Sequence, residues 1–157
     1  MLNITHLKES VYADPANIVD FSFSVVKQRE VFTGELGTKA NEIVKNYLTK
    51  YEIKTYAWTV LPARICILAS PTKQKSIPQI FNELVWLLQK ACESQKVEFY
   101  KDFLDHVLRR AEDPRMRALD LLEKPAKLGL VNDWLDYPLL GSNQYFIQEL
   151  AVAKVAA

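Results

Sequence analysis

Alternating apolar and polar residues predict two neighbouring strands in the middle of the chain. One apolar run covers 56–61 and a second covers 65–69, and together with Thr55 and Arg64 their residues alternate between two faces. Such period-two patterns are typical of half-buried strands. Pro62 lies between the runs and cannot donate a backbone hydrogen bond inside a sheet, so it marks a tight turn between antiparallel strands. In the first run Tyr56, Trp58 and Val60 are predicted to share one face of the strand. In the second run Arg64, Cys66 and Leu68 are predicted on one face, and Ile65, Ile67 and Ala69 on the other.

The remaining pattern predicts the order strand-helix-strand-strand-helix-strand, followed by a short helix. This is the order of a ferredoxin-like α+β sandwich, βαββαβ, with an antiparallel sheet and helices on one face. Ser76 opens one helix with a capping box, and Asp113-Pro114 opens another. The other predicted elements are a strand over 18–26, a helix from Thr38 to about Tyr51, a helix from Ser76 to about Cys92, a strand over 103–109 and a helix from Asp113 to about Glu123.

The segment after Gly141 carries a weaker helical pattern. Its apolar residues are Phe146, Ile147, Leu150, Val152 and Val155. Such a helix either packs on its own domain or forms a contact in a homodimer. We interpret 1–157 as one domain, with a core over about 17–140 and a C-terminal helical extension over about 142–157.

Composition predicts a folded, water-soluble protein. Of the 157 residues 49% are hydrophobic and 25% charged, and the net charge is +1. No apolar run reaches membrane-spanning length, and the first ten residues do not resemble a secretion signal. Cys66 and Cys92 are expected to be buried thiols in a reducing compartment, so we expect a cytoplasmic protein.

Histidine and cysteine spacing gives no metal-site motif. The two histidines, His6 and His106, are isolated in the sequence. Asp105 and His106 are neighbours on a predicted strand, so their side chains should point to opposite faces and not bind one ion. We therefore expect neither a metal ion nor another cofactor.

Five tracts resemble the single-tyrosine HUH transposases, in particular the relatives that process repetitive extragenic palindromes. That family has an aromatic-apolar-apolar-Leu/Met-Pro tract followed by a polar residue and histidine-hydrophobic-histidine, and residues 57–66 are similar to it except at the histidines. The other tracts follow in the family's order at 25–32, 105–109, 125–131 and 136–138. The resemblance covers roughly 17–145 and implies the same ferredoxin-like fold.

The residues that the resemblance places in the active site have changed type. Arg64 and Cys66 stand at the two histidine positions, Asp120 at the tyrosine and Lys124 at the Asn or Gln that completes the metal site. In the family a divalent ion polarises the scissile phosphate and the tyrosine attacks it. Two cations and a soft thiol suit neither Mg²⁺ nor Mn²⁺. The resemblance therefore implies a degenerate relative without catalytic residues.

A charge cluster could replace the lost metal. Asp120 and Lys124 are four residues apart on a predicted helix, and the family's geometry would bring Arg64 to face them. We predict an Arg64–Asp120–Lys124 cluster. The alternative is a solvated helix pair worth about 0.3–0.5 kcal/mol.

Basic residues near this region are candidates for nucleic-acid binding. They are Arg64, Arg109, Arg110, Arg115, Arg117, Lys124 and Lys127. Acidic residues lie among them and the net charge is only +1, so the alternative is an ordinary solvated surface. Tyr56, Trp58 and Trp86 could stack on bases, but their positions favour the core.

Two function classes remain. The first is a domesticated relative of a bacterial mobile element's transposase that binds single-stranded or hairpin DNA or RNA without cutting it. The second is a protein-interaction or scaffold module that has lost nucleic acid. An active enzyme is disfavoured, because no alternative triad or metal constellation is present in the sequence.

Overall fold

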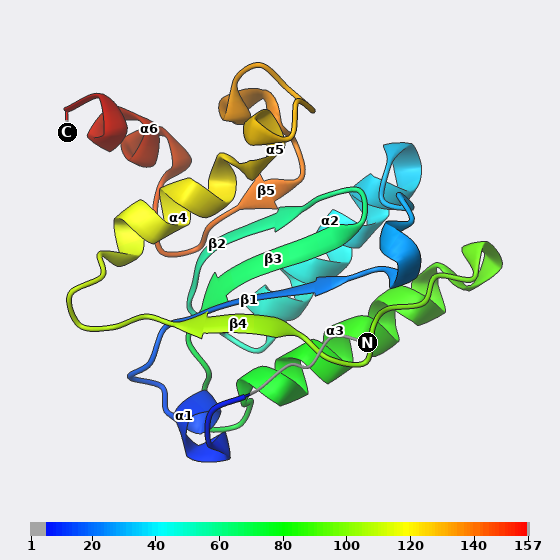
Figure 1. The fold of residues 1–157 in the computed structure, drawn as a ribbon, viewed down its shortest axis with the longest axis horizontal. Coiled ribbons are helices and arrows are strands. Elements are labelled where there is room, and N and C mark those ends of the chain that lie inside the picture. Colours follow the sequence, from blue (N-terminus) through cyan, green and yellow to red (C-terminus); the bar gives the residue numbers. More distant parts are fainter. Residues whose placement is uncertain (1–5, 157) are drawn as a thin grey trace.

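A five-stranded antiparallel sheet forms the centre of the computed structural model (Figure 1). The structure describes residues 6–156, and of residues 153–156 it describes the backbone alone. The strands are β1 (Val19–Ser24), β2 (Thr55–Val60), β3 (Arg64–Ala69), β4 (Leu104–Val107) and β5 (Leu140–Gly141). Their order in the sheet is β4-β1-β3-β2-β5, and every neighbouring pair is antiparallel. The first four strands have the ferredoxin-like arrangement, so the predicted fold is confirmed.

Two helices cover one face of the sheet, α2 (Gly34–Lys50) and α3 (Ile77–Ala91). Between them and the sheet lies the larger apolar core, to which Ile65 and Ile67 contribute. The predicted capping box at the start of α3 is confirmed: the Gln79 backbone N–H donates to Ser76 Oγ at 3.4 Å, and the Ser76 N–H donates to Gln79 Oε1 at 2.9 Å. A short helix, α1 (Glu9–Ala13), packs beside α3.

The other face is only partly covered. The helix α4 (Pro114–Leu122) packs mainly over β2 and encloses a second apolar cluster with Cys66 and Leu68. Its predicted N-cap is confirmed, since the Asp113 carboxylate accepts from the Arg115 N–H at 2.9 Å. Figure 1 shows this face of β1 and β4 with no described helix over it.

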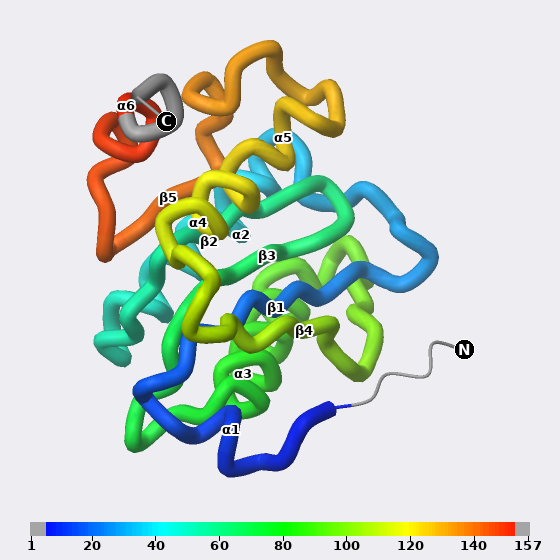
Figure 2. The backbone as a smooth tube through the Cα atoms, turned by 60° about the vertical axis from the view of Figure 1, so that its left-hand side comes forward, coloured from blue at the N-terminus to red at the C-terminus, as the bar shows by residue number. Residues whose placement is uncertain are grey.

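Short helices complete the chain. They are η1 (Val26–Gln28), η2 (Glu93–Gln95), α5 (Lys124–Lys127), η3 (Trp134–Asp136) and α6 (Ile147–Ala156). α6 lies beside α4 (Figure 2) and buries Leu150 in the second apolar cluster. Phe146 and Val152 are exposed, and the Val155 side chain lies outside the described residues. The extension packs on its own domain, and the homodimer stays a prediction. None of the described helices is long and apolar enough to cross a membrane.

The predicted alternation in β2 is wrong at one residue. The β2–β3 register shifts between Thr55 and Ala57, and Tyr56 packs against the same apolar cluster as Ala57. A bulge of this kind adds one residue to a strand and breaks the alternation of faces. Trp58 lies in the other, larger core and is 6% exposed, as predicted.

The prediction that Trp86 lies in the core is wrong. Its side chain is 58% exposed on α3, and the Lys90 ammonium lies 4.7 Å from the centre of the ring. The buried stripe of α3 is Ile77, Ile80, Phe81, Leu84 and Leu88. Trp86 lies outside that stripe, because residues two apart on a helix point in different directions.

The helix α2 begins earlier than predicted, with Thr33 rather than Thr38 at the N-cap position. Thr38 lies inside the helix and its hydroxyl donates to the Gly34 carbonyl at 3.3 Å. The first turn contains Gly34 and Gly37. Because glycine is a weak helix former, the sequence pattern does not indicate a helix at these residues. Gly37 is required by packing, because a Cβ there would lie 2.9 Å from both Leu139 Cδ1 and the Phe32 carbonyl oxygen.

A histidine holds the N-terminal segment against the sheet. His6 Nε2 lies 2.6 Å from Asp102 Oδ1 and His6 Nδ1 lies 3.0 Å from Asp105 Oδ1. The ring stacks on Phe103 at a centroid distance of 4.5 Å, and the Tyr12 hydroxyl donates to Asp105 Oδ2 at 2.8 Å. Desolvation alone would lower the pKa of His6, but the two aspartates outweigh it and raise the pKa above 6.5.

Stability should therefore depend on the protonation of His6. Because its pKa is raised on folding, the charged ring stabilises the fold fully below about pH 6.5, and this contribution is lost as pH rises through the folded pKa. Urea unfolding of the wild type and of His6→Phe, which keeps the stacking, should differ more at about pH 6 than at about pH 9. An equal difference at both values would contradict the assignment.

Candidate functional site

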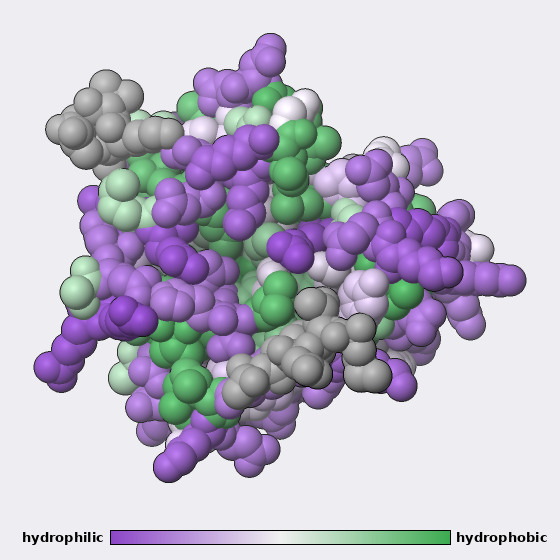
Figure 3. All heavy atoms as spheres, viewed as in Figure 1, coloured by the Kyte–Doolittle hydropathy of each residue, from purple (hydrophilic) through white to green (hydrophobic). Residues whose placement is uncertain are grey.

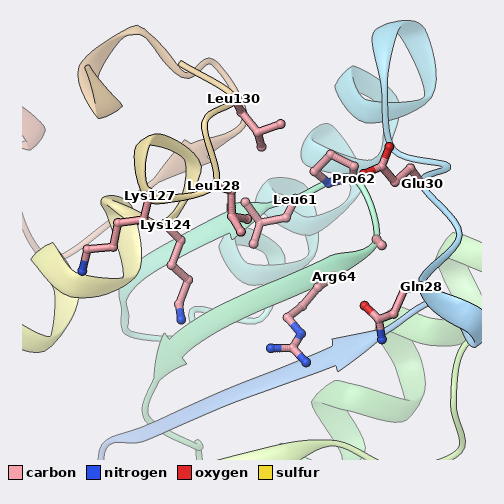
Figure 4. Close-up of a pocket in the computed structure, with 10 residues that line it drawn as sticks. Gln28, Glu30, Leu61, Pro62, Arg64, Lys124, Lys127, Leu128 and Leu130 are labelled. Atoms are coloured by element: carbon pink, nitrogen blue, oxygen red, sulfur yellow. The ribbon is translucent and has the colours of Figure 1, made fainter. Parts of the chain in front are cut away.

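The β2–β3 turn and the short helix α5 border an open pocket of about 560 Å³ (Figure 4). Its lining residues come from the segment at the end of η1, from the β2–β3 turn and the first residue of β3, and from α5 and the turn after it. They are Gln28, Glu30, Leu61, Pro62, Ala63, Arg64, Lys124, Lys127, Leu128 and Leu130. The pocket therefore brings together three segments that are far apart in the sequence.

Local backbone geometry fixes the walls. The Pro62 carbonyl accepts from the backbone N–H groups of Val31 and Phe32, both at 3.0 Å, which ties the turn to the segment after η1. At the end of α5 the Leu130 N–H donates to the Pro125 carbonyl at 2.9 Å and the Gly129 N–H to the Ala126 carbonyl at 3.0 Å. This is a Schellman motif, and Gly129 supplies its left-handed residue with φ of 76°.

Arg64 and Lys124 supply positive charge to the pocket. Arg64 Nε donates to Ser24 Oγ at 3.0 Å, on the strand beside it. Neither Arg64 nor Lys124 forms an ion pair with a carboxylate among the described residues. Both side chains extend over the sheet, whereas Lys127 points away from Arg64 (Figure 4). Two cations thus face one open space.

The predicted Arg64–Asp120–Lys124 cluster is wrong. Asp120 is exposed and forms no ion pair with either cation in the described part of the chain. The reason is that α4 ends at Leu122 and a separate helix begins at Lys124. The spacing of four residues therefore does not place the two side chains on one face of one helix.

Cys66 lies beneath these two cations in the sheet. It is 1% exposed, and it and Cys92 are buried free thiols as predicted. Burial raises the pKa of the Cys66 thiol to about 12, although the nearby Lys124 and Arg64 oppose the shift. The thiol is therefore protonated at neutral pH, whereas metal coordination requires the thiolate.

The residues at this site do not fit a hard divalent cation, because the site offers such an ion a buried neutral thiol and two positively charged side chains. Across the described residues no group of three His, Cys, Asp or Glu side chains could hold a metal. Asp105 and His106 point to opposite faces, as predicted: Asp105 contacts Tyr12, and His106 Nε2 lies 2.8 Å from Glu112 Oε1. That the chain binds no metal stays a prediction.

The other basic candidates lie outside the pocket. Arg117 forms ion pairs with Asp20 at 2.8 Å and with Glu112 at 3.8 Å. The Arg115 guanidinium lies 5.5 Å from the centre of the Tyr145 ring, and Arg109 and Arg110 are exposed in the loop before α4. Of the predicted candidates, only Arg64, Lys124 and Lys127 share the pocket.

Sequence reasoning missed four lining residues, Gln28, Glu30, Leu128 and Leu130. Leu128 and Leu130 are 62% and 43% exposed, so both leucine side chains are accessible from the open pocket. The signal was present, since they flank Gly129 at a helix end. Gln28 and Glu30 had no comparable signal, because only the fold brings them beside Arg64 and Pro62.

Comparison with solved structures places the fold among transposase-like proteins. A REP-associated tyrosine transposase bound to a REP hairpin is 18% identical, with a TM-score of 0.70 over 87% of this chain and 82% of that one. A candidate transposase from Deinococcus radiodurans R1 is 16% identical, with a TM-score of 0.49 over 68% of this chain and 88% of that one. No protein-family model and no curated protein sequence matches. At these identities the likeness concerns the fold.

Proposed function

We propose that this chain is a transposase-like protein that binds single-stranded or hairpin nucleic acid, DNA or RNA, at the Arg64–Lys124 pocket without cutting it. The observation that carries the proposal is that two cations, neither of them in an ion pair among the described residues, line one open pocket. Among the described residues Lys75 and Arg117 are the lysine and arginine that form ion pairs, so Arg64 and Lys124 are distinguished by lining one pocket rather than by lacking a carboxylate. Two cations placed in this way are suited to phosphate oxygens.

The open sheet surface supports the same proposal. On the face that α4 leaves uncovered, β1 places Asp20, Ser22 and Ser24 in alternation. Ser22 is partly exposed, whereas Asp20 is paired with Arg117 and Ser24 is 8% exposed. Ser24 already contacts Arg64. Hydroxyl groups and arginine are common partners of a nucleic-acid backbone, and a strand leaving the pocket could cross this face. The transposase in the hairpin complex has a similar fold, which makes a hairpin a reasonable first probe.

Loss of cleavage rests on the chemistry of four positions. Arg64, Cys66 and Lys124 do not suit a divalent ion, and Asp120 carries no phenol to attack phosphorus. Incubating the protein with hairpin DNA and Mn²⁺ should therefore give no covalent protein–DNA adduct on a denaturing gel. An adduct would overturn this part of the proposal.

Binding is tested with a fluorescent hairpin that carries a single-stranded tail. Affinity measured by anisotropy should fall as salt rises from about 50 to 200 mM, with a logarithmic slope near −1.4 if two phosphates of the tail are contacted. The slope reports the number of cations released and is independent of any sequence preference. Absence of salt-dependent binding at micromolar protein would instead indicate the scaffold function.

A further inference from the structure

The pocket has a second chemical character besides its charge. Leu61 and Pro62 of the β2–β3 turn and Leu128 and Leu130 of the α5 end all line it (Figure 4). In the space-filling view, apolar side chains gather over α5 and the chain that follows it, next to a hollow over the sheet (Figure 3). Exposed leucines beside cations would suit a ligand that is flat and apolar in one part and anionic in another.

Polar groups occupy the remaining rim at defined places. Figure 4 shows Gln28 beside Arg64, and Glu30 at the other end, next to Pro62. Neither side chain has a hydrogen-bond partner within the described residues. The Glu30 carboxylate at one end and the two cations at the other make the two ends of the pocket opposite in charge. An anionic group is favoured beside Arg64 and Lys124 and disfavoured beside Glu30.

Gln28 is held in place by a strained segment. Lys27 and Gln28 have φ of 61° and 53°, which residues other than glycine rarely adopt. The Lys27 N–H donates to the Tyr100 hydroxyl at 3.0 Å, and the Gln28 N–H donates to the Val25 carbonyl at 3.0 Å. Strain that the surroundings maintain is common at binding sites. The backbone of Gln28 is therefore fixed beside the pocket that its side chain lines.

We propose that this pocket takes one unpaired nucleobase of a bound strand. The base lies against the apolar wall of Leu128, Leu130 and Pro62, as bases removed from a stack do in other proteins. The Gln28 amide can both donate to and accept from the polar edge of the base. The adjoining phosphate lies between Arg64 and Lys124. The volume of about 560 Å³ admits a group of this size. This inference rests on the proposed function and names the ligand of the same site.

The experiment separates the base from its backbone. Hairpins are prepared with a short tail made entirely of abasic nucleotides, or with one adenine restored at each tail position in turn, so that phosphate charge is constant. Restoring the base at one position should tighten binding about 5–10-fold. Leu130→Ser should remove this gain and keep the salt slope. Leu135→Ser is the matched control, because that leucine is 46% exposed and outside the pocket.

The outcomes distinguish the two proposals. If the abasic tail binds as tightly as every base-bearing tail, with the salt dependence retained, the nucleobase site is overturned and the proposed function stands. If the gain survives Leu130→Ser, the base lies elsewhere and this inference is likewise overturned. If no hairpin binds, both proposals fail. Circular dichroism of each variant verifies that it is folded.

Discussion

Reversing both pocket charges, in Arg64→Glu/Lys124→Glu, is expected to weaken binding to single-stranded or hairpin DNA on the order of 100-fold at about 50 mM salt. The variant replaces the two cations that face the pocket with carboxylates, so it removes two phosphate contacts and adds repulsion. The logarithmic salt slope should fall towards zero at the same time. Fluorescence anisotropy over a salt series measures both quantities. The loss should be smallest at high salt, where screening weakens the electrostatic term.

A matched control carries the same change of net charge at a different place. Lys45 on α2 and Lys73 in the loop before α3 are exposed and lie outside the pocket. Lys45→Glu/Lys73→Glu should therefore bind nearly as the wild type does. If the control loses as much affinity as the pocket variant, binding depends on overall charge, and the pocket is not the site.

Replacing Trp58 with alanine is expected to lower the free energy of unfolding by about 3–5 kcal/mol, the usual range for a large buried aromatic. The indole is 6% exposed, and its Nε1–H donates to Asn41 Oδ1 at 3.0 Å. It also packs so closely on β5 that a Cβ at Gly141 would lie 2.4 Å from Trp58 Cζ2. The variant leaves a cavity and removes the partner of Asn41. Urea unfolding followed by circular dichroism measures the loss.

The comparison for this prediction is Trp86→Ala, which removes the same side chain from an exposed position. Trp86 contacts the Lys90 ammonium on the surface of α3. Its loss should change the unfolding free energy by no more than about 0.5 kcal/mol. Equal destabilisation by the two variants would contradict the placement of Trp58 in the core and of Trp86 outside it.

Local rules predicted much of the fold because they act over a few residues. Alternation in β3 predicted that Cys66 and Leu68 share one face and that Ile67 lies on the other. The structure confirms this, with Cys66 and Leu68 in the apolar cluster under α4 and Ile67 in the larger core. Ser76 and Asp113 cap their helices through side chains that reach two or three residues along the chain. Such contacts are encoded in adjacent residues, and the rest of the fold does not alter them.

The same rules gave wrong predictions where the local structure depends on contacts with residues distant in the sequence. The bulge at Tyr56 depends on how β2 pairs with β3, and the start of α2 depends on Gly37 packing against Leu139 and Phe32. Asp120 and Lys124 had the spacing of a helix pair, but the break between α4 and α5 separates them.

The sequence by itself determined the ferredoxin-like order and which residues of β3 share a face. That Arg64, Cys66, Lys124 and Asp120 replace the metal-binding and nucleophilic residues of the resembled family stays a prediction. Only the tertiary structure decided that Arg64 and Lys124 share an open pocket, that Asp120 stays outside it, and that Gln28 and Leu130 complete its walls. The physical reason is range. A strand pattern or a helix cap depends on neighbouring residues, whereas a pocket depends on segments that meet only when the chain has folded.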